Sequence, residues 1–179
     1  MNTKQSLERF ERIAHEYVRQ LDRYDMDQLT RIPAEGEWSL GQVYVHLINA
    51  ANRMQLGNVE LCRTKDPDPA ANAGKSERGE AAFAAGRFPP IRVRVEPSPH
   101  YTPLQPESKE QLAAALHELA GRMRDVEPTL ADIPETATVP HPAFGGLNAK
   151  EWFELVEMHF RHHLLQKERL DAFLLQPQS

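Results

Sequence analysis

Four long segments carry apolar residues at alternating spacings of three and four, and this periodicity constrains the fold more than any other feature. Such spacing places the apolar side chains along one face of an α-helix, where other helices can cover them. The segments, together with the residues that cap them, span roughly residues 3–29, 39–63, 108–130 and 148–173. Four amphipathic helices of this length predict an all-α protein, with a four-helix bundle as the arrangement that buries each apolar face.

The last three segments each begin with a residue that can cap a helix, followed three residues later by Glu or Gln. This is the pattern of a capping box. The pairs are Ser39 with Gln42, Ser108 with Gln111, and Asn148 with Glu151. The apolar face expected for the second segment consists of Val43, Leu47, Ala50, Met54 and Leu61.

The connection from Thr64 to Pro106 is long, about 43 residues, and holds eight of the 14 prolines. Within it, "SERGEAAFAAG" indicates a short additional helix, and Ile91–Val95 alternates as an edge strand does. Thr136–Val139, in the next connector, is the candidate partner for a tiny two-stranded sheet. A connection of this length lets the second and third helices run parallel. We therefore expect one long crossover, 64–106, within a single domain of residues 1–179.

Charge and composition limit the partners. The formal net charge is -5 with a pI of about 5.9, and no basic stripe stands out, which argues against binding to nucleic acid or to anionic lipid. The stretch "MNTKQSLERF" lacks the apolar core of a secretory signal, so we expect no such signal. No apolar run approaches the ~20 residues that a membrane span requires. The single cysteine, Cys62, cannot form an internal disulfide. A cytoplasmic protein is expected.

Polar residues interrupt the apolar face of the last segment. That face reads Trp152, Val156, His159, His163, Gln166, Leu170 and Phe173. Residues four apart on a helix differ by about 40° in direction and roughly 6 Å in height, so His159 and His163 can reach one metal ion. The zincin motif HExxH uses this spacing. Here the intervening residues are "FRH", without the glutamate, so the chain is not a zincin.

A metal site of this kind needs a third protein ligand, which in a bundle comes from a facing helix. His46 is the candidate, because it lies on the apolar side of the second segment. The other histidines stand beside an apolar face or in proline-rich loops: His15, His117, His100 and His141.

Four further polar residues stand near these histidines in the sequence. They are candidates for side chains that contact a metal ligand or a substrate: Gln166, Asn49, His162 and Arg53. Each has an ordinary alternative as an exposed or salt-bridged helix residue. No residue is a convincing general base, so the catalytic residues are not assigned.

The histidines also have an interpretation without a metal. Burying imidazoles costs roughly 1–3 kcal/mol for each group left without a partner, and either a metal or a complete hydrogen-bond network removes that cost. The residues by themselves therefore leave two classes open. One is a metal-dependent enzyme, and the other is a binding or structural bundle with a hydrogen-bonded histidine layer.

Two motifs and the long crossover resemble the DinB-like superfamily, including its thiol-transferase branch. The motifs are "EWSLGQVYVHL" and "HPAFGGLNAKEWFELVEMHFRHHLLQ". The resemblance implies a four-helix bundle with a long connection between the second and third helices. It also implies a divalent ion, usually zinc or nickel, held by one histidine of the second helix and an HxxxH pair of the fourth. The matching positions are His46, His159 and His163.

The resemblance further implies a small-molecule substrate. Relatives transfer thiols such as bacillithiol or mycothiol, or are presumed hydrolases, and homodimers are frequent among them. A metal-bound thiol is deprotonated, and a metal-bound water has its pKa lowered to near 7. A thiol transferase and a hydrolase are both consistent with three neutral imidazole ligands.

Overall fold

The structure is a computed structural model that describes residues 2–66, 72–88 and 102–175. In chain order its helices are α1 (Thr3–Leu21), α2 (Met26–Thr30), α3 (Leu40–Asn49), the π-helix η1 (Ala50–Gln55), α4 (Leu56–Thr64), α5 (Glu77–Ala85), α6 (Lys109–Val126), the 3₁₀-helix η3 (Glu127–Asp132) and α7 (Ala149–Leu174). Two strands, β1 (Thr138–His141) and β2 (Gly145–Asn148), pair antiparallel just before α7.

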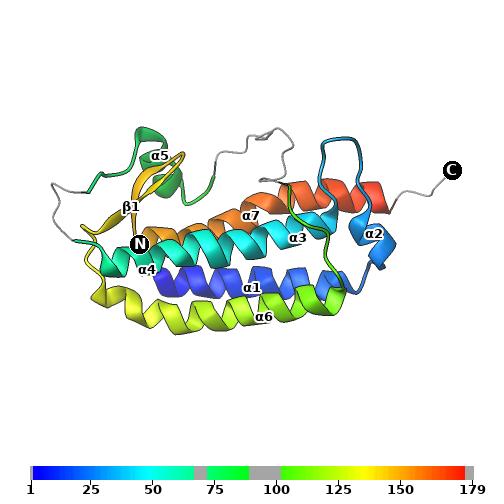
Figure 1. The fold of residues 1–179 in the computed structure, drawn as a ribbon, viewed down its shortest axis with the longest axis horizontal. Helices are drawn as coiled ribbons and strands as arrows, with labels where there is room; N and C mark the ends of the chain where they lie inside the picture. The colour runs from blue at the N-terminus through cyan, green and yellow to red at the C-terminus, as the bar shows by residue number, and fades with distance from the viewer. Residues whose placement is uncertain (1, 67–71, 89–101, 176–179) are drawn as a thin grey trace.

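Four long helical units lie side by side and form the bundle: α1, the continuous run α3–η1–α4, α6 and α7 (Figure 1). The unit α1 packs against α6 and α7, and both α3 and α4 pack against α7. The second and third units run in the same direction, because α4 ends and α6 begins at opposite ends of the bundle (Figure 1). The predicted all-α fold with its tiny two-stranded sheet is confirmed.

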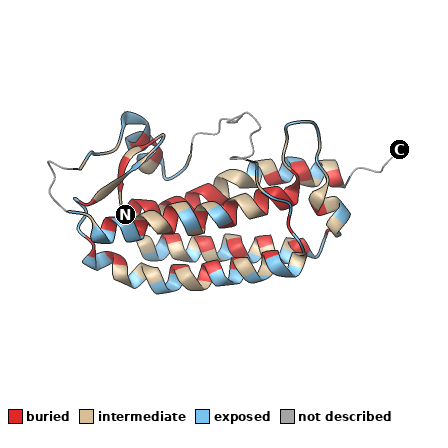
Figure 2. Ribbon diagram, in the orientation of Figure 1, coloured by how far each residue is buried: buried red, intermediate tan, exposed pale blue. Residues whose placement is uncertain are grey.

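Buried residues follow the inward faces of all four units (Figure 2). The rings of Phe10 and Phe160 meet edge to face at 5.2 Å, which joins α1 to α7. The hydroxyl of Tyr17 donates to the carbonyl of Phe160 at 3.3 Å, and the hydroxyl of Tyr44 donates to the carbonyl of Tyr17 at 2.8 Å. Buried hydroxyls need hydrogen-bond partners. Because these two hydroxyls find theirs on neighbouring helices, the bonds hold α1 against α3 and α7.

The helix starts expected from the sequence are present. Ser39 and Asn148 each form a reciprocal capping box with the residue three positions later. The first helix differs from expectation, since α1 ends at Leu21 and α2 follows it after a turn. The reason is Asp25, whose side chain accepts from the backbone N–H of Gln28 and so caps a new helix.

The apolar face of the second helix is predicted correctly only in its first half. Val43 and Leu47 are buried as expected, but Leu61 is 54% exposed. From residue 50 the buried positions that correspond to Ala50, Met54 and Leu61 are one residue later, at Ala51, Gln55 and Cys62. Leu56 and Val59 are buried as well. The π-helix η1 causes this shift, because its i→i+5 hydrogen bonding inserts one extra residue into the turn.

The long connection contains the expected short helix. Ser76 caps the start of α5, and Gly86 ends it in the left-handed conformation with a φ of 60°. The expected strand at Thr136–Val139 is found as β1, displaced by two residues, and it pairs with β2. The partner expected for this strand, Ile91–Val95, lies outside the described residues, and β2 was not predicted as a strand from the sequence. Within the described ranges, every helix is too short or too polar to cross a membrane.

The hairpin and α5 are joined to each other over one end of the bundle (Figure 1). The backbone N–H of Ser76 donates to the carbonyl of Phe144 at 2.8 Å, and the backbone of Lys75 forms an isolated antiparallel β-bridge with that of Gly145. The indole N–H of Trp152 donates to the carbonyl of Val139 at 3.2 Å, which holds the hairpin against α7. The hairpin therefore has a fixed position on the helix that carries His159 and His163.

Candidate metal centre

Three imidazole rings converge inside the bundle. The Nε2 atom of His159 lies 3.2 Å from Nε2 of His46 and 3.1 Å from Nε2 of His163. One ligand atom from each ring lies within 4.8 Å of the others. His46 comes from α3 and the other two from α7, so the group, called the histidine triad below, requires the packing of two helices.

The spacing of the triad fits a tetrahedral metal. Three nitrogens at 2.0–2.1 Å from a tetrahedral zinc ion are about 3.3–3.4 Å from one another. The two Nε2 separations of His159, 3.2 and 3.1 Å, are close to this value. The third pair, His46 and His163, has ligand atoms within 4.8 Å of each other. Imidazole nitrogens are also ligands that zinc and nickel accept.

Two carboxamides contact the far nitrogens of the α7 rings. Nδ1 of His163 lies 2.8 Å from Oε1 of Gln166, and Nδ1 of His159 lies 3.2 Å from Nε2 of Gln55. A metal-binding imidazole normally donates its other N–H to such a partner, which fixes the tautomer and the ring orientation. Oε1 of Gln166 already serves this purpose for His163.

Burial keeps the triad neutral. It lowers the pKa of His46 and of His163 to about 4, and with the neighbouring histidines it lowers the pKa of His159 well below its usual range. Imidazoles bind metals only in the neutral form. At neutral pH the triad therefore presents uncharged nitrogen ligands, and a bound divalent ion would keep its full charge.

Aromatic rings border the triad. The ring of Phe88, just after α5, stacks on His159 with a 5.9 Å centroid separation and lies 5.3 Å from the rings of His162 and Phe144. The ring of Trp38 lies 4.9 Å from that of His46. Apolar walls of this kind exclude water and strengthen electrostatic interactions inside a site.

The other residues considered from the sequence divide into two groups. Gln166 contacts the triad through His163, and His162 is partly buried beside Phe88. Asn49 and Arg53 are both exposed, and in the described part of the chain neither forms a hydrogen bond with a triad residue. The π-helix shifts the register of the second helix, which accounts for the outward position of Arg53.

Sequence reasoning missed Gln55 and Phe88. Gln55 is 1% exposed, and an uninterrupted α-helix would point it away from His46. The available signal was the four-residue spacing of Val43, Leu47, Ala51 and Gln55, which fits a π-turn better than a regular helix. Phe88 carried no signal, because only the placement of α5 brings it to the triad.

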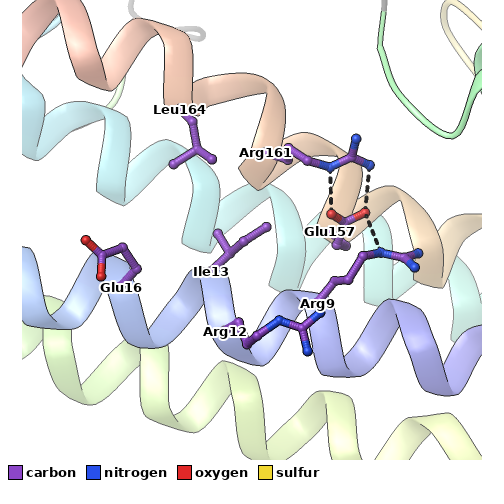
Figure 3. Close-up of a pocket in the computed structure, with 7 residues that line it drawn as sticks. All are labelled: Arg9, Arg12, Ile13, Glu16, Glu157, Arg161 and Leu164. Carbon is purple, nitrogen blue, oxygen red and sulfur yellow. Dashed lines mark hydrogen bonds and ion pairs between the residues drawn. The ribbon is translucent and has the colours of Figure 1, made fainter.

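Two other features do not belong to the triad. A groove between α1 and α7 is lined by Arg9, Arg12 and Arg161, but Arg9 and Arg161 pair with the buried carboxylate of Glu157 (Figure 3). Cys62 is fully buried, and burial raises its pKa to about 11. A reactive thiolate at the triad therefore has to come from outside the chain.

The family model of the DinB superfamily matches residues 9–166. The chain belongs to the DinB superfamily. The match includes all three histidines of the triad and both carboxamides that contact them. No curated protein matches the sequence significantly.

Membership in the DinB superfamily agrees with the fold and with the triad. The family is one of metal-associated helical proteins, and the triad is a group of ligands that could hold a divalent ion. The resemblance noted from the two sequence motifs is thereby confirmed for the family.

Proposed function

We propose that the protein is a divalent-metal-dependent enzyme that acts on a small molecule, with His46, His159 and His163 holding zinc or nickel. The observation that supports this most strongly is the convergence of three neutral imidazoles from two helices, with Nε2 of His159 at 3.2 and 3.1 Å from Nε2 of His46 and of His163 and one ligand atom of each ring within 4.8 Å of the others. When bound, the ion would supply Lewis acidity toward a thiol or a water molecule. The substrate class is a small thiol in a transfer reaction or a small hydrolysable compound.

The residues of the chain supply the setting for that chemistry. Gln166 fixes His163 by accepting its Nδ1–H, so the Nε2 lone pair points into the triad. Phe88 and Trp38 place aromatic rings against His159 and His46, which reduces the access of water to these two rings. Because Cys62 is buried, a thiol nucleophile is provided by the substrate.

A second candidate has an observation in its favour. The same contacts form a self-consistent hydrogen-bond chain, in which Nε2–H of His159 donates to Nε2 of His163 and Nδ1–H of His163 donates to Gln166. A histidine layer paired in this way needs no ion. The alternative is thus a non-enzymatic bundle whose polar layer fixes the packing of its helices.

Metal analysis of untagged protein distinguishes the two. We expect about one equivalent of zinc or nickel in the wild type and none in His159→Ala. Adding zinc at about 100 times its Kd should stabilise the metal-free wild type by about 2.7 kcal/mol, which raises Tm by roughly 5–11 °C. His117→Ala is the matched control, since His117 is exposed on α6 and should leave both results unchanged.

His163→Leu gives the opposite readings for the two candidates. If the triad holds an ion, the variant loses the zinc-induced rise in Tm. If the triad is only a hydrogen-bonded layer, zinc changes neither protein, and the leucine variant is as stable as the wild type or more so. That second outcome would refute the metal site.

A further inference from the structure

The π-helix η1 controls which side chain of the second helix reaches His159. In a regular α-helix, nine residues rotate the chain by about 900°, so Gln55 would point about 180° away from His46. The extra residue in the π-turn moves Gln55 back by about 100°. Gln55 is 1% exposed as a result, and its amide nitrogen lies 3.2 Å from Nδ1 of His159. π-Turns of this kind occur often at functional sites.

The amide of Gln55 is only half used. Its Nε2 contacts His159, while its Oε1 is buried and has no hydrogen-bond partner in the described part of the chain. A buried carbonyl oxygen without a partner is costly, so its presence beside the triad calls for an explanation. Gln166 differs, since its Oε1 already accepts from His163.

The protons of the triad supply that explanation. When Gln55 donates through Nε2, Nδ1 of His159 is an acceptor, so the single proton of this neutral ring is on Nε2. That proton points into the triad toward His163. A metal ligand must instead present a lone pair at Nε2, which moves the proton to Nδ1. The Nδ1–H group then needs an acceptor, and Oε1 of Gln55 can accept after a 180° rotation of the amide.

We propose that Gln55 is a positioning residue that selects the protonated nitrogen of His159, and that its amide turns over when the triad takes up a divalent ion. In the hydrogen-bonded layer the amide nitrogen of Gln55 donates to Nδ1 of His159. In the metal-bound triad the amide oxygen would accept from Nδ1–H of His159. This inference rests on the proposed metal site and assigns the choice between its two states to one side chain.

The test measures zinc affinity and the tautomer of His159 in the full-length protein, with zinc alone as the probe. Gln55→Leu removes both ends of the amide and should weaken zinc binding about 10- to 100-fold. Gln55→Glu keeps an acceptor and should bind zinc within about threefold of wild type or more tightly. Met54→Leu, in the same π-turn, is the matched control and should bind as wild type does.

Ring ¹⁵N shifts of His159, assigned by their loss in His159→Gln, report the tautomer directly. We expect Nε2–H in the metal-free wild type, Nδ1–H after zinc is added, and Nδ1–H in Gln55→Glu before any zinc is added. A purely structural role for Gln55 would weaken zinc binding equally in both variants and leave the tautomer unchanged.

The outcomes separate this inference from the proposed function. Wild type that binds zinc, together with Gln55→Leu of equal affinity, would overturn the role of Gln55 and leave the metal site intact. Metal-free Gln55→Glu that retains Nε2–H would also overturn it. Wild type that binds no zinc would overturn both the proposed metal site and the turnover of the amide.

Discussion

The buried carboxylate of Glu157 makes the effect of losing Arg161 large enough to measure. The side chain of Glu157 is 1% exposed, and Arg161 binds it through two hydrogen bonds of 2.7 and 2.9 Å (Figure 3). Arg161 also donates to the carbonyl of Gly86 at the end of α5. Gly86 is two residues before Phe88, so the same guanidinium anchors the segment that covers His159.

We expect Arg161→Ala to lower the free energy of unfolding by about 2–3 kcal/mol. Leaving a buried charge without its partner costs roughly 3–5 kcal/mol. The effect should be smaller than this for two reasons. Arg9 lies 3.8 Å from the carboxylate and still offsets part of its charge, and Arg161 is 38% exposed, so water can reach the carboxylate once Arg161 is removed. For a chain of this length, the change corresponds to a fall in Tm of roughly 4–12 °C.

Urea unfolding followed by far-UV circular dichroism measures this change. Arg9→Ala is the matched control. Its longer and half-exposed ion pair should contribute less than about 1 kcal/mol. The double variant Glu157→Leu/Arg161→Leu should recover most of the loss, because it removes the buried charge together with its partner. If Arg161→Ala costs no more than Arg9→Ala, the carboxylate does not depend on Arg161 and the reasoning is wrong.

Two further predictions concern His141 and Cys62. Burial, with the charge of a neighbouring arginine, lowers the pKa of His141 to about 4, so the unfolded chain binds a proton more readily and stability should rise with pH between about 4 and 6.5. The lowered pKa values of His46, His159 and His163 add to the same rise. His141→Asn should therefore reduce the slope without abolishing it in urea titrations at several pH values, and an unchanged slope would contradict the assignment. Cys62 should react with Ellman's reagent only after unfolding, since its thiol is buried and its pKa is raised to about 11. Rapid labelling of the folded protein would show that the thiol is accessible.

Local patterns determined the helices and half of the site. Capping residues and apolar spacing act within one segment, so the start of α7 and the pairing of His159 with His163 could be predicted from the sequence. Periodicity also placed His46 on the inward face of α3, before the π-turn begins. The structure and the match to the DinB superfamily model confirm the all-α fold that was predicted from the sequence.

The register after residue 50 depends on tertiary packing. A π-turn is unfavourable by itself and persists only where packing against neighbouring helices compensates for it. The four-residue spacing from Val43 to Gln55 therefore allowed the turn but did not require it. The turn placed Gln55 rather than Met54 against α7 and left Leu61 exposed. Phe88 likewise depends on how α5 is anchored to the hairpin and to α7. The sequence alone thus determined the candidate ligands, whereas the tertiary structure decided which side chains surround them, because those contacts join segments far apart in the chain.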